Sequence, residues 1–411
     1  MSKPRVAILH YSAPPVIGGV ESAVAAHASL LAERRYTVKV VAGRGEPFDP
    51  RVPLEIIPLL NSQHPFVLEV SRALTLGNVT PEMHALVAAI SHKLTEALTE
   101  VDVCIAHNAL TLHKNLALTG ALHAITQTEP RLRLIGWCHD FVWDDPVYAG
   151  ELHEGYPWNL LCHAWAGVQY VVVSEARRAT LANRFGLDAA KIAIVPPGVE
   201  AHEFFRMGET ATRWTRQLNL LSAEPLLLLP ARVTRRKNIE LAIDITAALR
   251  ALGWSPKLLV MGPPGAHNPS NRIYLNELLS LRRALRVEDA VIFLHEFGAV
   301  DDETRRDLYW LADALLFPSE REGFGVPILE AGLARLPIFC SDIAPFRESA
   351  GDWAHYFALD EPPRAIATRI AETLKHDARY QLKRRVAEQY GWFHIFQRHI
   401  EPLLRGGTPH G

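Results

Sequence analysis

Residues 317–341, FPSEREGFGVPILEAGLARLPIFCS, predict a strand, a loop, a short helix and a second strand. Apolar runs stand at both ends, and the loop between them contains two glycines. Pro327 suits the first helical position, where the N–H that proline lacks is not needed for a helical hydrogen bond. We therefore expect the helix to begin at about Val326 and to carry Glu330 in its first turn.

Two carboxylates, Glu322 in the loop and Glu330 on the helix, bracket this turn. Free N–H groups at a helix start bind anions and hydroxyl-rich ligands, and the helix dipole adds partial positive charge. Each acid by itself is explained as well by helix capping, and Gly-Phe-Gly by a simple turn. The pair of acids after a strand of the parallel type favours a ligand-binding role.

Length and composition indicate a folded protein with two domains. The chain has 411 residues, more than one hydrophobic core usually supports. Its formal net charge is -2, whereas domains that bind nucleic acid through bulk charge are strongly basic. We therefore expect no nucleic-acid partner, while small anionic ligands remain compatible with this balance.

The cysteines and the N-terminus indicate a cytoplasmic protein. Cys104, Cys138, Cys162 and Cys340 are widely spaced and form no CxxC pair, which argues against a zinc ribbon or a redox dithiol. The N-terminus leads directly into an apolar strand, without the pattern of a signal peptide. No apolar run reaches membrane-spanning length, so we expect a protein that is neither exported by that route nor integral to a membrane.

Strand-like and helix-like segments alternate through the first half of the chain. The expected strands are residues 5–10, 37–42, 54–58, 102–106, 132–137, 168–173 and 192–195, and the expected helices are 20–34, 81–99 and 110–125. This alternation predicts a mostly parallel sheet with helices on both faces. Ligands of such sheets bind at the carboxyl ends of the strands, so functional residues should follow strands.

Gly18 and Gly19 stand between the first strand and its helix. Two glycines at this point allow a phosphate to approach the backbone and the free N–H groups of the helix, although a tight turn would also favour glycine. The loop contains neither G-x-G-x-x-G nor G-x-x-x-x-G-K-[ST]. A dinucleotide oxidoreductase and a P-loop protein are therefore disfavoured.

His139 follows the strand 132–137, at the edge where a ligand is expected. A single histidine is more often packed or capping than catalytic, and His107 also follows a strand. Residues 141–158 are aromatic and acidic and are longer than a plain connection. They indicate either an acceptor-side loop or a packed irregular segment.

A second domain begins at about residue 199. The segment Val195–Val199 contains two prolines and a glycine, which suits a domain boundary. The strand pattern starts again afterwards. Expected strands are 226–229, 257–261, 290–294 and 314–317, expected helices are 238–252 and 301–311, and the tail 362–404 reads as helical.

Four cations between Arg232 and Lys237 lead directly into the helix expected at 238–252. Positive charge at a helix start opposes the helix dipole unless an anion neutralises it. A diphosphate would do so, because arginine can bind two oxygens at once and lysine adds a point charge. We assign Arg232 and Lys237 to such a ligand, whereas Arg235 and Arg236 are explained better as solvated cations.

Together these motifs resemble those of retaining GT-B glycosyltransferases of family 4, also called group 1. The most specific is the pair of glutamates separated by seven residues in residues 322–330, EGFGVPILE. The others are weaker singly: they are Gly18-Gly19-Val20-Glu21, His139-Asp140, Val195-Pro196-Pro197-Gly198-Val199 and the block from Arg232 to Lys237. The resemblance is clearest in the second half and thinner between about residues 44 and 130.

The resemblance implies an α/β fold with two Rossmann-like domains that face each other across a cleft. Residues 1–198, joined by a C-terminal helix at about 390–405, would form the acceptor-side domain, and residues 199–389 the domain that binds a nucleotide sugar. The implied catalytic residues are His139, Arg232, Lys237 and Glu322. The implied donor-binding residues are Gly18, Gly19, Arg232, Lys237, Phe324, Gly325, Val326 and Glu330.

Within this set, Arg232 and Lys237 would bind the diphosphate and Glu330 the ribose. Glu322 would contact the transferred sugar, and His139 would contact that sugar near the reacting carbon. Retention would follow from attack on the same face of the sugar, with the leaving phosphate accepting the acceptor proton. The sequence has no Asp-x-Asp signature, so we expect no metal and no cofactor besides the nucleotide-diphosphate sugar.

The implied activity is transfer of a hexose from a UDP- or GDP-sugar to a hydroxyl acceptor, in polysaccharide, glycolipid or glycoside synthesis. The chain departs from the family pattern at Pro197, at Glu200, at Pro230-Ala231 and in the loop Gly262-Pro263-Pro264-Gly265. The first two concern the hinge, and the last two leave the nucleotide base open. The sequence indicates no oligomeric state.

Two other functions stay open: a sugar-nucleotide epimerase or phosphorylase of the same fold, and a catalytically silent carbohydrate-binding or scaffolding member. A lipid-linked acceptor would add weak peripheral contact at the inner face of a membrane. The basic runs Arg177-Arg178 and Lys383-Arg384-Arg385 could provide it, although such runs are usually solvated helix faces.

Overall fold

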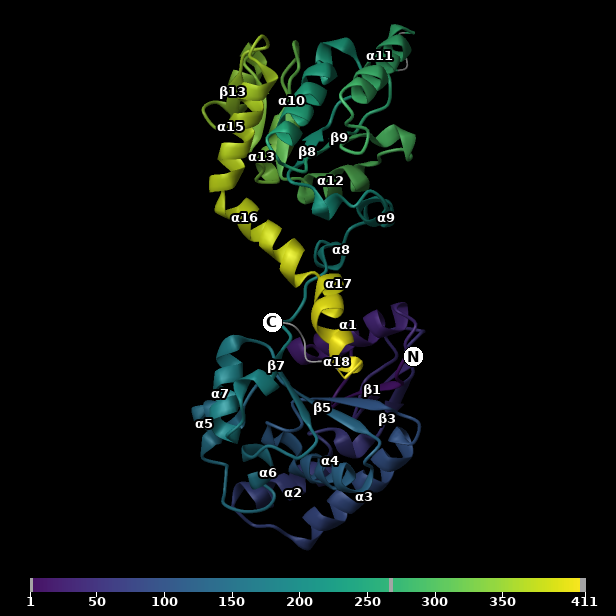
Figure 1. The fold of residues 1–411 in the computed structure, drawn as a ribbon, viewed down its shortest axis with the longest axis vertical. Coiled ribbons are helices and arrows are strands. Elements are labelled where there is room, and N and C mark those ends of the chain that lie inside the picture. Colours follow the sequence, from purple (N-terminus) through teal and green to yellow (C-terminus); the bar gives the residue numbers. More distant parts are fainter. Residues whose placement is uncertain (1–2, 266–268, 407–411) are drawn as a thin grey trace. The chain divides into compact units, whose positions relative to one another are not determined.

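The computed structural model describes residues 3–265 and 269–406, in two compact units that each contain one sheet. Unit 1 consists of Met1–Val199 with Tyr390–Gly411, and unit 2 of Glu200–Gln389. Figure 1 shows parallel strands flanked by helices in each of them. The expectation that the two domains face each other across a cleft stays a prediction.

The sheet of unit 1 is parallel throughout, in the order β3-β2-β1-β4-β5-β6-β7. Its strands are β1 Val6–His10, β2 Val38–Ala42, β3 Leu54–Ile56, β4 Val103–His107, β5 Arg133–Cys138, β6 Gln169–Val172 and β7 Ala193–Ile194. Strands β1, β4 and β5 are neighbours in the middle of this sheet. The residues that follow these three strands therefore meet at one edge of the sheet.

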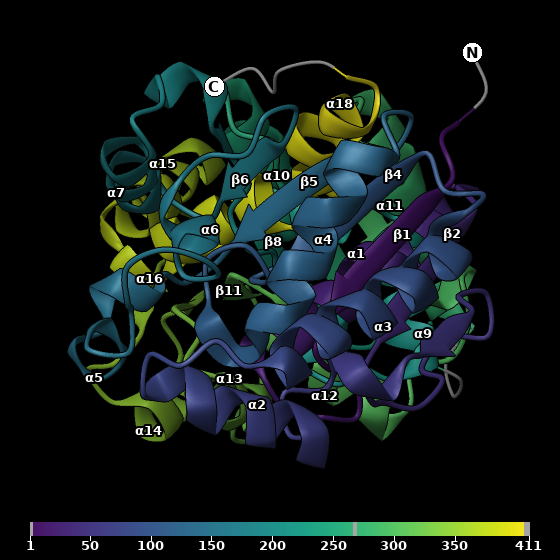
Figure 2. The ribbon, with the colours of Figure 1, turned by 90° about the horizontal axis from the view of Figure 1, so that it is seen from below.

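Helices cover both faces of this sheet. They are α1 Gly19–Glu33, α2 Pro65–Thr75, α3 Pro81–Leu98, α4 Leu116–Thr128, α5 Pro146–Ala149, α6 Asn159–Cys162 and α7 Glu175–Phe185. Alternate residues of β1 point to opposite faces: Ala7 and Leu9 pack with α3 and α4, and Val6 and Ile8 pack with α1. Figure 2 shows α3 and α4 lying across the strands of this sheet.

The helical segment 392–404 packs on the α1 side of unit 1. Beyond the π-helical turn η8 Val386–Tyr390 lie α17 Trp392–Ile395, the π-helical turn η9 Phe396–Ile400 and α18 Glu401–Leu404. Trp392 and Phe396 are buried in the core that contains Val24 of α1, whereas Phe393 is half exposed beneath the guanidinium of Arg34. A Cβ at Gly198 would lie 2.4 Å from Trp392, so a side chain at residue 198 would collide with the indole ring.

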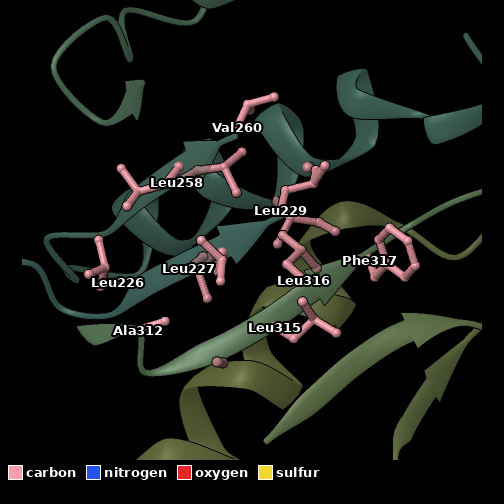
Figure 3. Close-up of a cluster of buried hydrophobic side chains, with 14 of the residues drawn as sticks. Leu226, Leu227, Leu229, Leu258, Val260, Ala312, Leu315, Leu316 and Phe317 are labelled. Carbon is pink, nitrogen blue, oxygen red and sulfur yellow. The ribbon is translucent and has the colours of Figure 1, made fainter. Parts of the chain in front are cut away.

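The sheet of unit 2 is also parallel, in the order β10-β9-β8-β11-β12-β13. Its strands are β8 Leu226–Leu229, β9 Lys257–Val260, β10 Val291–Phe293, β11 Ala314–Phe317, β12 Ile338–Ser341 and β13 His355–Phe357. Strands β8, β9 and β11 are almost entirely apolar and buried, as expected of strands covered on both faces. Figure 3 shows their side chains packed together.

The helices of unit 2 lie around this sheet. They are α8 Ala201–Phe204, α9 Glu209–Gln217, α10 Ile239–Ala251, α11 Ser270–Ala284, α12 Asp302–Leu311, α13 Val326–Leu333, α14 Ala344–Ala350, α15 Pro363–His376 and α16 Ala378–Arg385. Four loops follow the carboxyl ends of strands: β8 to α10, β9 to α11, β10 to α12 and β11 to α13. These loops carry the residues that the motifs single out.

Several elements differ from the sequence predictions. The helix expected at 110–125 begins only at Leu116, because Asn108 takes a left-handed φ of 57° and Asn115 caps the N–H of Leu118. The predictions did not include α2, α7, α11 or β13. Helix α7 has few apolar residues and buries Leu181, so its hydrophobic pattern is weak.

Four residues of the basic runs considered for membrane contact, Arg177, Arg178, Lys383 and Arg384, have acidic partners within their own units. Arg177 pairs with Asp144 at 2.6 Å, and Lys383 pairs with Asp313 at 2.6 Å. Arg384 pairs with Glu388 at 2.5 Å. Within the described ranges 3–265 and 269–406, no helix is both long and apolar enough to cross a membrane.

Candidate active site

Arg232 lies in the loop between β8 and α10 of unit 2. Its side chain is exposed, and it has no hydrogen bond or ion pair with any residue that the structure describes. After it come the 3-10 turn η6 Arg235–Lys237 and Asn238, whose left-handed φ of 48° leads into α10. The guanidinium of Arg232 is therefore available to a ligand.

The loop after β9 runs beside this loop and shapes it. The N–H of Gly262 donates to the carbonyl of Ala231 at 2.9 Å, and the N–H of Val233 donates to the carbonyl of Pro263 at 3.1 Å. A Cβ at Gly262 would lie 2.6 Å from the Cα of Arg232. Glycine at residue 262 therefore allows the two backbones to approach, and this close approach sets the position of Arg232.

Lys237 and Glu322 form a buried ion pair. The Lys237 ammonium donates to Oε1 of Glu322, and Arg236 donates to Oε2 at 2.9 Å. Both side chains of the Lys237–Glu322 pair are 10% exposed. The Lys237 ammonium also lies 4.8 Å from the ring centre of Phe317. The first glutamate of the motif is thus joined to the basic block.

The pKa directions of this pair follow from burial and charge. Burial raises the pKa of Glu322, but hydrogen bonds and charge attraction from Lys237, together with Arg236, outweigh it and hold that pKa below its ordinary value. Burial lowers the pKa of Lys237, while Glu322 works in the opposite direction. We conclude that Glu322 is a carboxylate near neutral pH.

Carboxylates of unit 2 neutralise three of the four cations that oppose the dipole of α10. Arg236 and Lys237 bind Glu322, and Arg235 binds Glu277 at 2.7 Å. Arg236 is exposed, as expected of a solvated cation, but it also binds Glu322, a partner that the sequence did not indicate. Arg232 is the cation of the block that stays without such a partner among the described residues.

Gly325 forms the turn into α13. Its φ is 97°, and a Cβ would lie 2.9 Å from the ring of Phe346, so glycine is required by conformation and by space. The helix begins at Val326, as predicted, but Pro327 occupies its second position. The first turn holds no acidic residue. The expectation that Glu330 belongs to the first turn is wrong, because a helix has 3.6 residues per turn and Glu330 is the fifth residue.

Glu330 instead points to α12. Its Oε2 accepts a hydrogen bond from the Tyr309 hydroxyl at 2.6 Å, and its Oε1 lies 3.2 Å from Arg305. Tyr309 and Arg305 stand four residues apart on one helical face, which lets both reach the same carboxylate. Because the Glu330 side chain keeps 27% of its surface exposed, it remains accessible to a ligand.

A pocket of about 600 Å³ brings part of the predicted donor site together. Its lining includes Arg232, Val326 and Glu330. The remaining lining residues are Pro230, Ala231, Met261, Gly262, Pro263, Pro264, Val300, Asp302, Arg305 and Pro327. A cation, a carboxylate and an apolar wall therefore share one pocket at the strand ends. Lys237, Glu322, Phe324 and Gly325 are not among its lining residues, and Phe324 is exposed.

His139 of unit 1 is held from two sides by the end of β4. Its Nε2 lies 2.9 Å from Nδ1 of His107, and its backbone N–H donates to Oδ1 of Asn108 at 2.8 Å. Burial and, to a smaller extent, the neighbouring His10 lower the pKa of His139 to about 4, although Asp140 opposes the shift. His139 is therefore a neutral imidazole near pH 7, with Nδ1 as the ring nitrogen left for a ligand.

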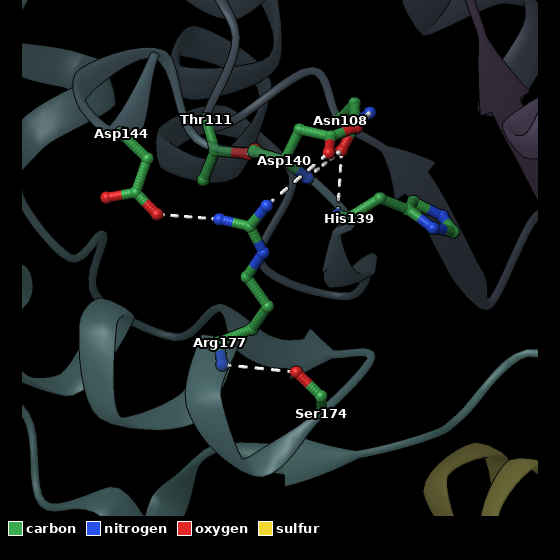
Figure 4. Close-up of polar contacts among 7 residues, drawn as sticks. All are labelled: Asn108, Thr111, His139, Asp140, Asp144, Ser174 and Arg177. Carbon is green, nitrogen blue, oxygen red and sulfur yellow. Dashed lines mark hydrogen bonds and ion pairs between the residues drawn. The ribbon is translucent and has the colours of Figure 1, made fainter. Parts of the chain in front are cut away.

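Asn108 organises the turn after β5 (Figure 4). It accepts from the N–H groups of His139 and Asp140 and donates to Oδ2 of Asp140 at 3.3 Å. Arg177 joins Asp140 at 3.8 Å to Asp144 at 2.6 Å, on the far side of the same turn. This network fixes the backbone that carries His139.

A buried cluster of rings surrounds these histidines. His27 lies 4.6 Å from the ring of Trp137 and 5.5 Å from that of His107, measured between ring centres. Burial lowers the pKa of His27 to about 3 and that of His107 well below its ordinary value. Nε2 of His107 and Nδ1 of His27 are buried without a partner among the described residues. The cluster is consequently electroneutral near pH 7.

Gly18 and Gly19 stand at the start of α1. Gly18 precedes the helix in an extended conformation, and a Cβ there would meet the Glu21 carboxylate. At Gly19 a Cβ would have open space around it. The geometry leaves room for a ligand at Gly19, and it contains no feature at either residue that requires one.

Sequence reasoning did not identify His107, Asn108, Tyr309 and Arg305 as parts of the site. His107 and Asn108 lie at the end of β4, which is the neighbour of β5, and His139 follows β5. Their place at the end of a neighbouring strand could have identified them as candidates. The other two stand four residues apart on a predicted helix, with no pattern to link them to Glu330. Within the ranges that the structure describes, no group of three or more His, Cys, Asp or Glu could hold a metal ion. The expectation of a metal-independent reaction stays a prediction.

Two family descriptions match the chain. Residues 211–390 match the family described as Glycosyl transferases group 1, and residues 17–203 match Glycosyltransferase Family 4. The two matches leave out residues 1–16, 204–210 and 391–411. Each match therefore lies almost entirely within one of the two units.

Individual relatives share about a quarter of their residues with this chain over the matched part. The chain is 26% identical over 291 residues to the mannosylglucosylglycerate synthase of Petrotoga mobilis, a match that covers 64% of this chain and 66% of that protein. It is 27% identical over 242 residues to the D-inositol 3-phosphate glycosyltransferase of Kineococcus radiotolerans, covering 55% and 54%. The chain thus spans between about half and two thirds of the length of these curated relatives.

Among solved structures, the Anabaena protein Alr3699/HepE in complex with UDP matches 98% of this chain and 100% of its own. The TM-score is 0.38 and the sequence identity 16%.

Proposed function

Because this chain belongs to the group 1 glycosyltransferases of family 4 type, with the GT-B fold, we propose that it transfers a hexose from a nucleotide-diphosphate sugar to a hydroxyl acceptor. The observation that carries this proposal is the pocket of about 600 Å³ in unit 2. The lining of this pocket includes Arg232, which has no partner among the described residues, and the carboxylate of Glu330. Both lie beside the start of α13, because Val326 lines the same pocket. A diphosphate and a ribose need these two kinds of group at neighbouring points.

Arg232 binds the diphosphate in this proposal, and Glu330 accepts hydrogen bonds from ribose hydroxyls. Tyr309 and Arg305 hold Glu330 in a single orientation, which lowers the entropy cost of ordering it for the ligand. The apolar wall from Met261 to Pro264 suits the nucleotide base. A carboxylate with two protein partners still has lone pairs for two hydroxyls.

Lys237 and Glu322 act as one unit on the transferred hexose and its phosphate. Both oxygens of Glu322 are engaged by Lys237 and Arg236, so the carboxylate is rigid and oriented. We propose that Glu322 binds hydroxyls of the hexose, while Lys237 adds positive charge toward the leaving diphosphate. The N–H groups of Phe324, Gly325 and Val326, at the start of α13, bind along the sugar and phosphate.

His139 contacts the transferred sugar near its anomeric carbon, and Gly18 and Gly19 contact the phosphate. The neutral state of His139 matters, because its Nδ1 then exchanges a hydrogen bond with a sugar hydroxyl without adding a positive charge beside an oxocarbenium-like centre. Nδ1 of His107 holds the His139 ring at its Nε2, which leaves Nδ1 of His139 for this contact.

The reaction breaks the bond between the anomeric carbon and the phosphate oxygen and forms a bond from that carbon to the acceptor oxygen. The electron pair of the broken bond stays with the phosphate oxygen, and the acceptor proton moves to the departing phosphate. Fixed positive groups stabilise the leaving diphosphate, an effect for which one lost donor costs roughly 3 to 4 kcal/mol. Attack from the face that the phosphate leaves gives retention of configuration, without a metal in this proposal.

A panel of UDP-, GDP- and ADP-hexoses tests the proposal and identifies the base. We expect one donor to raise the melting temperature and to be hydrolysed slowly without acceptor. NMR of the transferred product then reports the anomeric configuration, and inversion would refute the retaining mechanism. Addition of EDTA should leave the turnover unchanged. Failure of every donor to bind would refute the assignment.

The other functions make different predictions for the same panel. An epimerase interconverts the donor sugars without transfer to an added acceptor, a phosphorylase releases sugar phosphate from a glycoside with inorganic phosphate, and a silent member binds a donor without any turnover. The names of the two relatives include glucosylglycerate and inositol 3-phosphate, so small polyols belong in the acceptor panel.

We further propose a cytoplasmic location with at most weak peripheral membrane contact. The runs at Arg177 and Lys383 are committed to internal acidic partners, which leaves little free charge for anionic lipids. Sedimentation with phosphatidylserine vesicles at 0.1 M salt should leave most of the protein in the supernatant. Salt-sensitive cosedimentation would refute this location.

A further inference from the structure

Unit 1 contains a second pocket of about 500 Å³, which no donor residue lines. It lies beyond the carboxyl end of β1, between α2, the 3-10 turn η2 His113–Asn115 and the segment after β5. His10, at the end of β1, forms part of its wall. Nδ1 of His10 lies 3.0 Å from the carbonyl of His107, the residue whose ring holds His139. The pocket is therefore connected through one residue to the proposed catalytic histidine of the same unit.

The neutral part of the lining suits a polyhydroxylated molecule. Ser62, Gln63 and Ser71 contribute polar side chains, and Tyr148 and Trp158 contribute aromatic surface. Hydroxyls and amides exchange hydrogen bonds with hydroxyl groups in both directions. Aromatic rings provide flat apolar area with a polar edge, which fits the C–H face of a polyol or sugar.

The two carboxylates in the lining already have partners. Glu21 accepts a hydrogen bond from the Ser12 hydroxyl at 2.6 Å and lies 3.7 Å from Nε2 of His10. Glu151 lies 2.9 Å from Nε2 of His113. Their negative charge is therefore partly satisfied within the wall.

The two cations in the lining are not satisfied in this way. Arg44 follows β2 and Lys114 lies in η2, and the side chain of neither has a hydrogen bond or ion pair within the described part of the chain. Burial lowers the pKa of His10 and of His113, and the charge of Lys114 lowers both further. The two histidines thus do not add charge near neutral pH, and the open positive charge belongs to Arg44 and Lys114.

We propose that this pocket binds an acceptor that is a polyol or sugar carrying one acid group, a carboxylate or a phosphate, held by Arg44 and Lys114. The proposal rests on the proposed glycosyl transfer and specifies its acceptor class. Charge-assisted hydrogen bonds to an anion are roughly twice as strong as neutral ones, so two such cations dominate the selection. The remaining hydroxyls of the acceptor lie against the neutral part of the wall.

Binding is measured first without any donor, so that the result does not depend on turnover. The probes are glucose, glucuronate and glucose 6-phosphate, which share one ring and differ in charge. Ligand-observed NMR titrations give the dissociation constants for the wild type, for R44Q, K114Q and for the double variant R44Q/K114Q. The matched control is R131Q/K191Q, because these two exposed cations lie in unit 1 outside the pocket.

We expect an acidic probe to bind at least tenfold more tightly than glucose to the wild type and to the control. The double variant should bind all three probes alike, and each single variant should lose part of the preference. A larger gain for glucose 6-phosphate identifies a phosphate acceptor, and a larger gain for glucuronate a carboxylate acceptor. Equal binding of all probes to the wild type, or a preference that survives R44Q/K114Q, overturns the proposal.

A donor assay separates this inference from the proposed function. If a nucleotide hexose is consumed with neutral acceptors as fast as with acidic ones, transfer stands and the acceptor class is wrong. If the charge-selective binding is found and no donor is bound or consumed, the pocket stands as an acid-selective site and the proposed transfer fails.

Discussion

Unit 1 and unit 2 both place polar residues at the carboxyl ends of a parallel sheet, and they differ in how those residues tolerate burial. In unit 1, His10, His27, His107 and His139 are neutral, and burial lowers the pKa of each. In unit 2, the buried Lys237–Glu322 pair carries opposite charges. A neutral ring avoids the desolvation cost of an ion, whereas a buried ion must be compensated by a partner.

The difference suggests a division of tasks. In the proposed function, binding a diphosphate requires fixed positive charge, and the hydrogen bond that Lys237 donates to Glu322 keeps its ammonium in place. In the proposed function, contact with a sugar carbon that becomes positive requires polar groups without positive charge, and His139 is such a group because it is neutral near pH 7.

In unit 2, the variant Arg232→Ala should cause the largest loss of turnover. We expect turnover to fall roughly 100- to 1,000-fold, because removal of one donor to the leaving group costs roughly 3 to 4 kcal/mol. The melting temperature should not change, since Arg232 is exposed and has no partner among the described residues. Arg235→Ala is the matched control, because Arg235 binds Glu277 and should leave turnover near normal. Equal turnover of the Arg232 variant and the wild type would exclude Arg232 from the site.

The buried pair should show its coupling in stability. Lys237→Met leaves Glu322 with a single cation, Arg236, and should cost about 3 kcal/mol of the free energy of unfolding, the size found when one partner of a buried pair is removed. The double variant with Glu322→Gln should recover part of this loss, because no buried charge is then left unpaired. Urea unfolding of the single and double variants measures it. Additive losses would show that the two residues do not interact.

As the pH falls, the neutral histidines of unit 1 should reduce stability at a higher pH than the Lys237–Glu322 pair of unit 2. The pKa values of His27 and His139, about 3 and about 4 in the folded protein, lie below the ordinary value of about 6.5. The unfolded chain therefore binds more protons, so stability is complete above pH 6.5 and falls as the pH decreases toward the folded pKa. Each such histidine contributes up to about 1.4 kcal/mol per pH unit in this window.

Glu322 contributes to stability as a buried charge and not as a buried neutral group, and this contribution is lost in a lower pH range. Its pKa is lowered from 4.5, so the pair stabilises unit 2 above that pH and loses strength only as the pH falls below it. Hydrogen exchange at pH 6.5 and pH 5 should therefore show loss of protection around Trp137 and not around Phe317. A variant His27→Phe should weaken the response of unit 1. Equal loss in both units would contradict the comparison.

The support of His139 should appear in turnover more than in donor affinity. His107→Phe removes the bond to Nε2 and keeps an aromatic ring in the cluster, and we expect turnover to fall about tenfold, the cost of one hydrogen bond of about 1.4 kcal/mol. The donor dissociation constant should stay within about twofold. His107→Gln, which can restore a hydrogen bond, should recover part of the turnover. A donor affinity that falls with turnover would place His139 in ground-state binding.

Alanine variants of Glu322 and Glu330 should affect different kinetic parameters. Glu322→Ala should mainly reduce turnover, and Glu330→Ala should mainly weaken donor affinity. Tyr309→Phe removes one hydrogen bond to Glu330 and should raise the donor dissociation constant by a factor of about 3 to 10. Leu333→Ala, a change at an exposed residue of α13, the helix that carries Glu330, is the control. Similar effects of both glutamate variants on both parameters would remove the assigned roles.

Most strands were predictable because they are short apolar runs. Leu226–Leu229 and Ala314–Phe317 were predicted with the bounds that the structure has. A run that is buried on both faces must be apolar at every residue, so its pattern needs no neighbour to be recognised. Helices with a weak apolar face, such as α7, were not predictable in this way because their burial depends on what they pack against.

The motif residues were predictable as candidates, and their partners were not. The sequence by itself determined that Glu322, Arg232 and His139 follow strands and that Glu330 lies on the next helix, because strand and helix periodicity are local. Only the tertiary structure decided that Arg236 binds Glu322 and that His107 holds His139, since these pairs lie 86 and 32 residues apart along the chain. Hydrogen bonds and ion pairs depend on distances of a few ångströms, and the order of strands in a sheet sets those distances.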